Sequence, residues 1–310
     1  MKPMYIAGHR GLVGSAIWRE AQAHGVDLVG RTHAELDLGI KADVEAYVAE
    51  IEPGSIILAA ARVGGILANS TYPAEFLYDN LQIQLNVIQA AVDHQVPKLL
   101  FLGSSCIYPK FAPQPIAENS LLTGPLEPTN DAYAIAKIAG VLHIQAIRRQ
   151  YGLPYISAMP TNLYGPGDNF DLAASHVMPA MIRKMHEAKV SEKRYVDMWG
   201  TGSARREFLH VDDAAKACLF LLDNYDEPEP INVGTGEDLT IRELAVLVKK
   251  IVGFEGQLVW DSSKPDGTPR KQLDTRKINH LGWQPAIGLE EGIRSTYTWY
   301  LEHVDHDARL

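Results

Sequence analysis

The sequence predicts an α/β fold in which helices cover both faces of a doubly wound parallel sheet, with a smaller C-terminal lobe beside it. Short apolar segments alternate with longer segments of helical periodicity through residue 160, which is the pattern of consecutive strand and helix units. A glycine-rich turn directly follows the first apolar segment. Beyond residue 165 the pattern becomes irregular, with clusters of Pro, Gly and Asp between helical segments.

Five apolar runs have the length of strands. They lie at residues 5–7, 27–29, 55–58, 98–102 and 154–157. Helices are expected from residue 12, at 72–95, at 131–151 and, in the C-terminal part, at 212–224, 241–252 and 289–302. A parallel sheet built in this way presents the carboxyl ends of its strands at one edge, where α/β proteins bind their ligands.

Composition and charge exclude several classes of protein. The chain has 310 residues, of which 46% are hydrophobic and 22% charged, as is typical of a globular protein with a large core. Its formal net charge of −9 disfavours non-specific nucleic-acid binding. The sequence has no apolar run of membrane-spanning length, no signal-peptide pattern, and two cysteines, Cys106 and Cys218, without metal-binding spacing. We expect a cytoplasmic protein with no metal site and no disulfide.

A GxxGxxG motif follows the first predicted strand and leads into the first predicted helix. It comprises Gly8, His9, Arg10, Gly11, Leu12, Val13 and Gly14. Glycines at these positions allow a tight turn and a close approach of the backbone to a pyrophosphate, which the amides at the helix start would stabilise. The motif therefore predicts a Rossmann-like dinucleotide site. A purely structural glycine turn is the alternative.

The end of the second predicted strand indicates which dinucleotide is bound. An acidic residue there would hold the ribose hydroxyl of NAD, but the sequence carries Arg31. A guanidinium makes forked, charge-assisted hydrogen bonds to phosphate oxygens, so Arg31 together with Arg10 favours the 2′-phosphate of NADP. Alternatively, Arg31 is a solvated surface charge.

Tyr133 and Lys137 lie four residues apart in a predicted helix that Asn130 and Asp131 are expected to cap. Side chains at this spacing project from the same helix face. The spacing alone carries little weight, because chance produces it often. Its context adds weight, since Ser104 and Cys106 follow the fourth predicted strand, at the edge where a nicotinamide would lie.

This combination resembles the extended short-chain dehydrogenase/reductase family. Longer segments at residues 103–110, 126–130, 159–166, 206–213 and 263–271 are similar to the members that epimerise and reduce a GDP-4-keto-sugar, and the similarity runs from residue 4 to about residue 302. The resemblance implies that Tyr133 transfers the carbonyl proton, Lys137 lowers the Tyr133 pKa and holds the nicotinamide ribose, and Ser104 hydrogen-bonds the substrate oxygen. An unperturbed phenol titrates near pH ~10, so a neighbouring cation would help it to act near neutrality.

The implied reaction is the NADPH-dependent conversion of GDP-4-keto-6-deoxy-D-mannose to GDP-L-fucose, by epimerisation at C3 and C5 and then hydride reduction at C4. The C4 ketone acidifies both neighbouring carbons, and inversion needs one group to remove a proton and another to return one on the opposite face. The family's pair corresponds to Cys106 as base and His176 as acid. Without the resemblance, a single cysteine or histidine is more often structural, and Cys218 is expected to be a core residue.

The resemblance also implies the binding contacts. For NADP it adds to the glycine motif and Arg31 the residues Leu102, Gly103, Ser104, Ser105, Lys137, Pro160, Thr161, Asn162, Leu163 and His176. For the GDP-sugar it implies Lys184 and Arg206 at the diphosphate, Trp199 near guanine or ribose, Asp266 as an acceptor for a ribose hydroxyl or guanine, and Asn162 orienting the sugar. Alternatively, Trp199 belongs to the core of the lobe, and Arg206 pairs with Glu207 or Asp212.

The expected division of the chain follows from these contacts. Residues 1–165 would form the NADP-binding domain, with 207–235 returning to it, and residues 166–206 and 236–310 would form the substrate-binding lobe. The family commonly forms homodimers through the helices at 72–95 and 131–151. On the first of these, Leu77, Leu81, Leu85 and Ile88 fit either such an interface or an ordinary stripe facing the core.

Two other functions stay open from the sequence. One is a reductase, or an epimerase and reductase, for another 4-keto nucleotide sugar. The other is a non-catalytic NADP-sensing module. The set of Ser104, Tyr133 and Lys137 argues against the sensor, because a sensor has no use for a proton donor.

Overall fold

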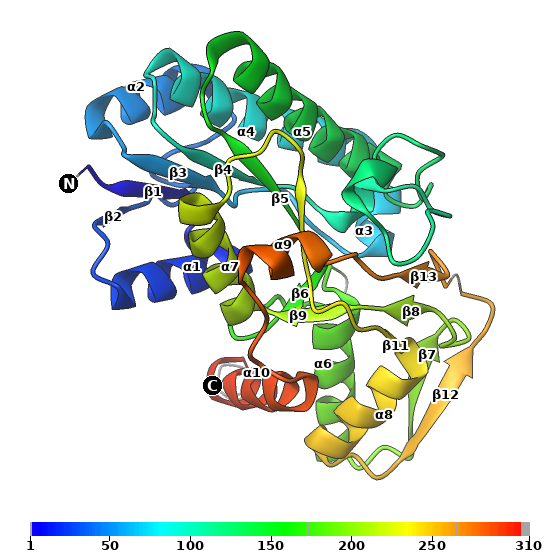
Figure 1. The fold of residues 1–310 in the computed structure, drawn as a ribbon. Helices are drawn as coiled ribbons and strands as arrows, with labels where there is room; N and C mark the ends of the chain where they lie inside the picture. The colour runs from blue at the N-terminus through cyan, green and yellow to red at the C-terminus, as the bar shows by residue number, and fades with distance from the viewer. Residues whose placement is uncertain (1, 173, 265, 305–310) are drawn as a thin grey trace.

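The computed structural model describes residues 2–172, 174–264 and 266–304, and a parallel sheet forms its centre (Figure 1). Within these residues the sheet has six strands in the order β10-β5-β4-β3-β1-β2. They are β1 Met4–Ala7, β2 Leu28–Val29, β3 Ser55–Leu58, β4 Leu99–Leu102, β5 Ile156–Pro160 and β10 Ile231–Val233. All neighbouring pairs are parallel, which confirms the predicted fold class. The residues of the predicted lobe at 173, 265 and 305–310 lie outside the described part.

Helices cover both faces of this sheet, as Figure 1 shows. On one face lie α2 Lys41–Ile51, α4 Pro73–Asp93 and α5 Asp131–Tyr151. The other face is covered by α1 Leu12–Ala23 and α7 Val211–Asn224. The remaining helices of the N-terminal half are α3 Ile66–Thr71 and two short 3-10 turns, η1 Ser105–Ile107 and η2 Glu118–Ser120.

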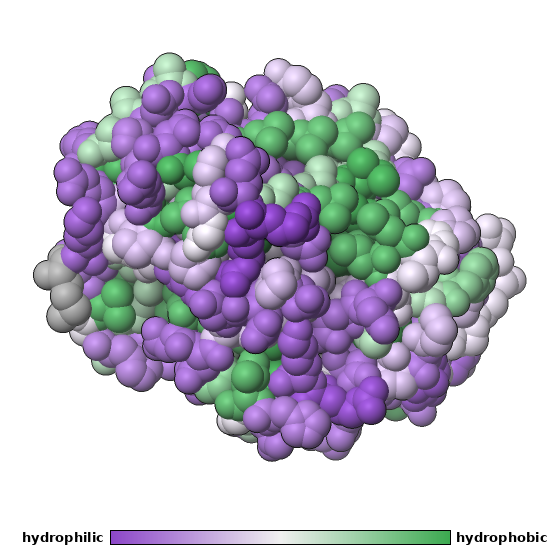
Figure 2. Space-filling model, turned by 45° about the horizontal axis from the view of Figure 1, so that its top comes forward, coloured by the Kyte–Doolittle hydropathy of each residue, from purple (hydrophilic) through white to green (hydrophobic). Residues whose placement is uncertain are grey.

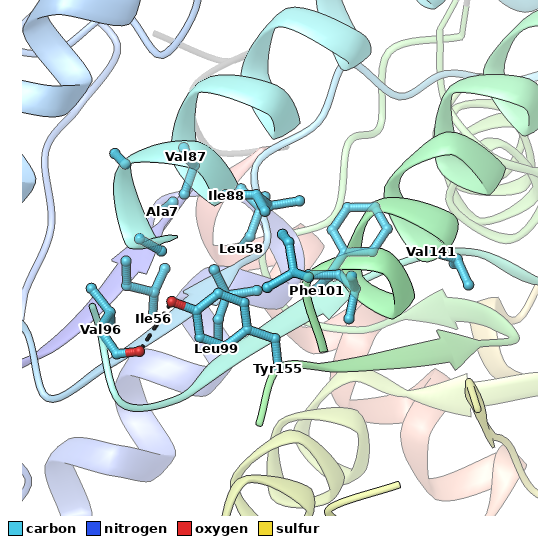
Figure 3. Packing of buried hydrophobic residues seen from close by; sticks show 14 of the residues in the cluster. Ala7, Ile56, Leu58, Val87, Ile88, Val96, Leu99, Phe101, Val141 and Tyr155 are labelled. Carbon is cyan, nitrogen blue, oxygen red and sulfur yellow. Dashed lines mark hydrogen bonds between the residues drawn. The ribbon is translucent and has the colours of Figure 1, made fainter. Parts of the chain in front are cut away.

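Alternate residues of the strands supply two hydrophobic cores. In β1, Tyr5 and Ala7 pack with α2, α4 and α5, whereas Ile6 packs with α1 and α7. Successive side chains of a strand point to opposite faces, so a strand covered on both sides is apolar throughout. Figure 3 shows the first core, in which Phe101 lies beneath α5 and the Tyr155 hydroxyl donates to the carbonyl of Val96 at 3.0 Å. Each fully buried aliphatic side chain contributes about 1.5–3 kcal/mol to stability.

A separate C-terminal cluster of helices has its own core. It contains α6 Val177–Val190, α8 Ile241–Val252 and α10 Leu289–His303, together with the paired strands β7 Tyr195–Trp199 and β12 Gln257–Asp261. Thr240 and Glu243 form a capping box at the start of α8, which satisfies two amides of the first turn. Gly253 ends this helix in the left-handed conformation.

Short strands join the sheet to this cluster. β6 Asn162–Tyr164 pairs with β9 Phe208–His210, and β8 Arg205–Arg206 lies between β11 Leu239–Thr240 and β13 Arg270–Lys271. Helix α9 Arg276–Leu281 follows β13. The pair of β6 and β9 brings the end of β5 beside the start of α7. The three strands β11, β8 and β13 bring residues near 205, 240 and 270 together.

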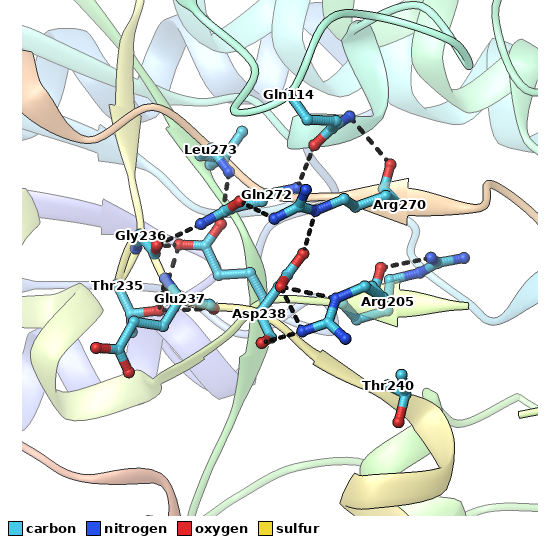
Figure 4. Close-up of polar contacts among 12 residues, drawn as sticks. Gln114, Arg205, Thr235, Gly236, Glu237, Asp238, Thr240, Arg270, Gln272 and Leu273 are labelled. Carbon is cyan, nitrogen blue, oxygen red and sulfur yellow. Dashed lines mark hydrogen bonds and ion pairs between the residues drawn. The ribbon is translucent and has the colours of Figure 1, made fainter. Parts of the chain in front are cut away.

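Two buried or partly buried carboxylates fix these crossing segments. Glu207 accepts hydrogen bonds from the amides of Gly236 at 2.8 Å and Leu273 at 2.7 Å. Asp238 accepts from Arg205 Nε at 2.9 Å and Arg270 Nε at 2.6 Å, and Figure 4 shows it between the two guanidinium groups. Charge-assisted bonds of this kind hold β8 and β13 in register.

Within the described residues, every helix is too short or too polar to cross a membrane.

Asp168, in the loop after β6, is a buried carboxyl group that generates a stability prediction. Its Oδ1 accepts from the amide of Asn169 at 2.7 Å, and its Oδ2 has no hydrogen-bond partner among the described residues. Burial raises the pKa of Asp168 to about 7. An unfolded Asp loses its proton near pH ~4, so between these values the folded state binds more protons and its stability falls as pH rises.

We therefore expect Asp168→Asn to raise the free energy of unfolding by about 1–3 kcal/mol at pH 8 and by less at pH 5. Urea denaturation at the two pH values measures this, with the exposed Asp27→Asn as the matched control. An equal effect at both pH values would mean that Asp168 is ionised in the folded protein throughout.

Candidate active site

The glycine motif forms a closely packed turn between β1 and α1. Gly8 has φ +87°, and a Cβ placed on it would lie 2.7 Å from the amide nitrogen of Ala60. A Cβ on Gly14 would lie 2.1 Å from the Gly8 carbonyl oxygen. Gly11 is different, because within the described residues the only atom near its Cβ position is that carbonyl oxygen, at 3.5 Å. The motif is therefore packed on the protein side and open at the start of α1.

This open side fits a pyrophosphate. Gly11 is the N-cap residue of α1, and among the described residues no side chain caps the helix there. The first amides of a helix carry partial positive charge and lack partners within the helix. The turn therefore offers donors to an anion, which is what the dinucleotide prediction requires.

Arg31 follows β2 as an exposed side chain, with its guanidinium 5.1 Å from the centre of the Tyr47 ring. His9 connects the glycine motif to this strand end. A Cβ on Gly30 would lie 2.7 Å from the His9 ring. That ring packs on Trp18, with 5.3 Å between the two ring centres. Burial and the charge of Arg10 lower the pKa of His9, so the imidazole is largely neutral at pH 7. Two exposed arginines thus lie on the two loops that meet at His9, as a 2′-phosphate site needs.

Ser104 and Tyr133 meet at the carboxyl end of β4. Ser104 begins η1, where its Oγ accepts from the amide of Cys106 at 3.2 Å, and Tyr133 lies in the first turn of α5. Burial raises the pKa of Tyr133, negative charge on Cys106 raises it further, and a hydrogen bond with Ser104 acts in the opposite direction. The phenol consequently stays protonated near neutral pH, as a group that must donate a proton requires.

Lys137 lies one turn further along α5 and is 4% exposed. Its ammonium donates to the Leu102 carbonyl oxygen at 2.8 Å and lies 5.9 Å from the centre of the Tyr133 ring. Burial lowers the pKa of Lys137 to about 7. The ammonium is directed at a carbonyl, and desolvation is the largest influence on the Tyr133 pKa. That Lys137 lowers the Tyr133 pKa therefore stays a prediction.

The sulfur of Cys106 has two neighbours that the sequence did not predict. Asn130 donates from Nδ2 to the sulfur at 3.2 Å, and Lys271 Nζ lies 3.5 Å from it. Asn130 does occupy the predicted N-cap position of α5, but within the described residues its side chain makes no capping bond. The prediction that the Asn130 side chain caps α5 is therefore wrong, because its amide donates to the thiol sulfur instead. Cys218 is buried in the core between the sheet and α7, as expected.

His176 is the N-cap residue of α6, and its side chain is accessible to solvent. The ring nevertheless lies among enough protein atoms that desolvation lowers its pKa. The backbone just before it is anchored to the start of α3, where the Gly65 amide donates to the Ala174 carbonyl at 3.1 Å. For the role of acid that the resemblance implies, a largely neutral imidazole would first have to take up a proton, and its exposed ring is accessible to water as a source.

The predicted nucleotide contacts gather around Trp199 at the end of β7. The indole is 50% exposed, so the alternative that it belongs to the core of the lobe is wrong. Lys184 and Lys264 each place Nζ 5.7 Å from the centre of its ring. A half-exposed indole beside two ammonium groups can stack on a base and stay close to phosphates.

Arg206 and Asp266 are neighbours at the same place. Arg206 donates to the carbonyls of Arg205 at 2.8 Å and Asp266 at 3.3 Å, which replaces the alternative pairing with Glu207 or Asp212. The Asp266 carboxylate accepts from the amide and the hydroxyl of Thr201, both at 2.8 Å. It therefore already has two protein donors, and a ligand hydroxyl would share it with Thr201.

The segment that joins β5 and β6 closes the site on the side of the sheet. Pro160 ends β5, and Leu163 lies in the middle of β6. Asn162 Nδ2 donates to the Glu207 carbonyl at 2.8 Å, and the Thr161 hydroxyl donates to the same oxygen at 3.2 Å. These bonds fix the segment against β9, beside the ends of β4 and β5.

Comparison with known proteins matches the family described as "NAD dependent epimerase/dehydratase family" over residues 4–234. The chain is similar to GDP-L-fucose synthase 1 of Arabidopsis thaliana, with 61% identity over 97% of this chain and 94% of that protein. It is 53% identical to GDP-L-fucose synthase of Escherichia coli, over 97% of each chain.

Two solved structures extend this similarity. A GDP-6-OMe-4-keto-L-xylo-heptose reductase from C. jejuni shares 37% of its sequence and superimposes with a TM-score of 0.94, covering 97% of this chain and 98% of that one. A GDP-L-fucose synthetase from Naegleria fowleri bound to NADP shares 27%, with a TM-score of 0.89 over 98% of this chain and 95% of that one.

The buried ammonium of Lys137 leads to a prediction about the pH dependence of stability. An unfolded lysine keeps its proton to about pH 10.4, so between pH 7 and that value the unfolded state binds more protons, and stability rises with pH. We expect Lys137→Met to raise the free energy of unfolding by about 1–3 kcal/mol at pH 6 and by less at pH 9. Chemical denaturation measures both, with the exposed Lys250→Met as control. A loss of stability at pH 6 would show that the ammonium stabilises the fold.

Proposed function

The chain belongs to the NAD-dependent epimerase/dehydratase family, and from this premise we propose that it converts GDP-4-keto-6-deoxy-D-mannose to GDP-L-fucose with NADPH. The reaction inverts C3 and C5 of the sugar and then reduces C4. Relatives named GDP-L-fucose synthase match the chain almost from end to end, which supports the identity of the sugar. The observation that carries the two-part chemistry is the meeting of a thiol, a phenol and a serine hydroxyl at the end of β4.

NADP(H) is the cofactor, and the open start of α1 fits its pyrophosphate. Arg10 and Arg31 bind its 2′-phosphate, and Lys137 binds its nicotinamide ribose. When bound, the cofactor supplies the hydride for C4. Ser104, Ser105 and the segment from Pro160 to Leu163 would hold the nicotinamide end, since all of them lie at or near the carboxyl ends of β4 and β5.

In the epimerisation, Cys106 acts on the hydrogens beside the ketone. Its sulfur takes the proton from the sugar carbon, and the electron pair of the C–H bond moves onto the carbonyl oxygen. Ser104 and Tyr133 donate hydrogen bonds to that oxygen as it becomes negative. His176 returns a proton to the opposite face of the carbon, which inverts it.

In the reduction, Tyr133 supplies the proton for the C4 oxygen. The raised pKa of this phenol keeps it protonated until negative charge develops on the substrate. Both half-reactions therefore use one oxygen-binding site, because both place negative charge on the C4 oxygen.

The GDP part binds at the C-terminal cluster. Lys184 and Arg206 contact the diphosphate, and Trp199 stacks on guanine or lies against the ribose. Asp266 accepts from a ribose hydroxyl or from guanine, and Asn162 orients the sugar. The exposed indole and the cations beside it support this assignment.

The protein acts as a homodimer through α4 and α5. Large apolar side chains are exposed on both helices, namely Tyr78, Leu85, Ile135 and Leu142. Figure 2 shows a broad hydrophobic area on this side of the molecule. Ile88, by contrast, is fully buried and belongs to the core.

Catalysis by a thiol requires reduced Cys106, which fits a cytoplasmic location.

Replacing the phenol separates the two half-reactions. We expect Tyr133→Phe to slow NADPH oxidation by about 10²- to 10⁴-fold, because the proton donor for C4 is lost. Exchange of the C3 and C5 hydrogens with deuterated water continues, because Cys106, His176 and Ser104 are intact. Mass spectrometry of the recovered sugar measures the exchange, with Cys106→Ser as the variant that loses it. Absence of exchange in the wild-type protein would overturn the epimerase assignment.

Replacing the arginine after β2 tests the cofactor site. Arg31→Ala removes charge-assisted hydrogen bonds to the 2′-phosphate, so we expect about 10- to 100-fold weaker NADPH binding with NADH binding unchanged. Fluorescence titration with each cofactor measures this, and the exposed Lys216→Ala provides the charge-matched control. An unchanged ratio of the two affinities would refute the phosphate contact.

A further inference from the structure

Cys106 is held by donors from segments that lie far apart in the sequence. Asn130 Nδ2, at the start of α5, lies 3.2 Å from the sulfur, and Lys271 Nζ, on β13, lies 3.5 Å from it. Ser104 adds a hydrogen bond from the neighbouring turn. A neutral thiol is a weak acceptor and needs no such set of donors, whereas a thiolate is stabilised by cations and by hydrogen bonds.

The backbone of β13 directs Lys271 at the sulfur. Arg270 is fixed on one side of the strand by Asp238 and by Gln272 Oε1, which its Nη2 contacts at 2.7 Å (Figure 4). Successive residues of a strand point to opposite sides, so Lys271 points away from this network. The pairing of β13 with β8 fixes the register. The backbone position from which the ammonium reaches the sulfur is thus set by strand pairing.

We propose that Lys271 and Asn130 are positioning residues that keep the sulfur of Cys106 as an anion before substrate binds. The inference rests on the proposed function, in which this sulfur is the base of the epimerisation. In the unliganded enzyme the thiol proton passes to water, and the Lys271 ammonium balances the remaining charge. On reaction the C–H bond of the sugar breaks, an S–H bond forms, and the electron pair moves onto the carbonyl oxygen.

The charged groups around the sulfur favour the anion from several elements. Lys271 faces it from β13, and Arg206 attracts it from β8. From α5, Asn130 donates to it, and the neutral phenol of Tyr133 brings no opposing charge. Burial acts to raise the pKa of the Cys106 thiol, but Lys271, Ser104 and Asn130 outweigh it and leave the pKa below its usual value.

Cys218 gives an internal comparison. It lies on α7 with its side chain buried in the core, and burial raises its thiol pKa to about 12. The chain has two cysteines in all, so a thiolate that forms near neutral pH belongs to Cys106. This makes a direct titration possible in the protein without substrate.

The test is a pH titration of thiolate ultraviolet absorbance and of the rate of alkylation by iodoacetamide, with mass spectrometry to assign the modified residue. In the wild-type protein Cys106 is expected to titrate below the usual value of about 8.5. Lys271→Gln is expected to raise the midpoint by about one pH unit or more, Asn130→Ala by less, and Lys271→Arg to keep it low. Lys250→Gln removes the same charge from the exposed side of α8 and is expected to leave the midpoint unchanged.

The pH dependence of deuterium exchange into the substrate is a second measurement, and it would not change if Lys271 had only a structural role. The exchange rate of Lys271→Gln is expected to fall at pH 7 and to recover at higher pH, once the thiol ionises without help. An ordinary midpoint in the wild-type protein, or the same midpoint in Lys271→Gln, would overturn the inference. The titration needs no sugar, so a failure of the proposed function leaves it unaffected. Loss of exchange with an unchanged midpoint would instead assign Lys271 to the substrate.

Discussion

Three titratable side chains share one poorly hydrated corner at the carboxyl end of β4, and the rest of the site depends on how they divide charge. Burial lowers the pKa of Lys137, so this side chain is partly neutral near pH 7, and burial raises the pKa of Tyr133, so the phenol keeps its proton. Cys106 differs because cations and amide donors reach it from other segments. Desolvation alone would make all three neutral, so the donors around the sulfur decide which group becomes the base.

In the reaction proposed above, this arrangement would couple Cys106 as the base to Tyr133 as the acid. Negative charge on Cys106 raises the pKa of Tyr133, so an ionised thiol helps to keep the phenol protonated. In that proposed reaction, uptake of a proton by the sulfur removes the negative charge that raises the Tyr133 pKa, so the phenol would share its proton more readily with the substrate oxygen. A single site can therefore pass from proton abstraction to proton donation without a change of fold.

Much of the fold and many of the site residues could be predicted from the sequence. The apolar runs predicted five of the six strands of the central sheet to within a few residues, because a strand buried on both faces has a simple pattern. The short edge strand β10 was not predicted. The start of α1 at Leu12 and both ends of α5 were also predictable. The residues around Cys106 were not. Lys271 lies 165 positions further along the chain, and Asn130 looks like an ordinary helix cap, so no local pattern indicated that either contacts the thiol.

The place of β10 in the sheet has a consequence for how the chain is made. β5 pairs with β10 on its outer side, yet the chain builds α6 and β7 of the C-terminal cluster before it reaches Ile231. While the protein emerges from the ribosome, β5 is an unprotected apolar edge for some seventy residues of synthesis. Association with other nascent chains at that edge is the hazard that this topology creates, and pairing of β10 with β5 ends it.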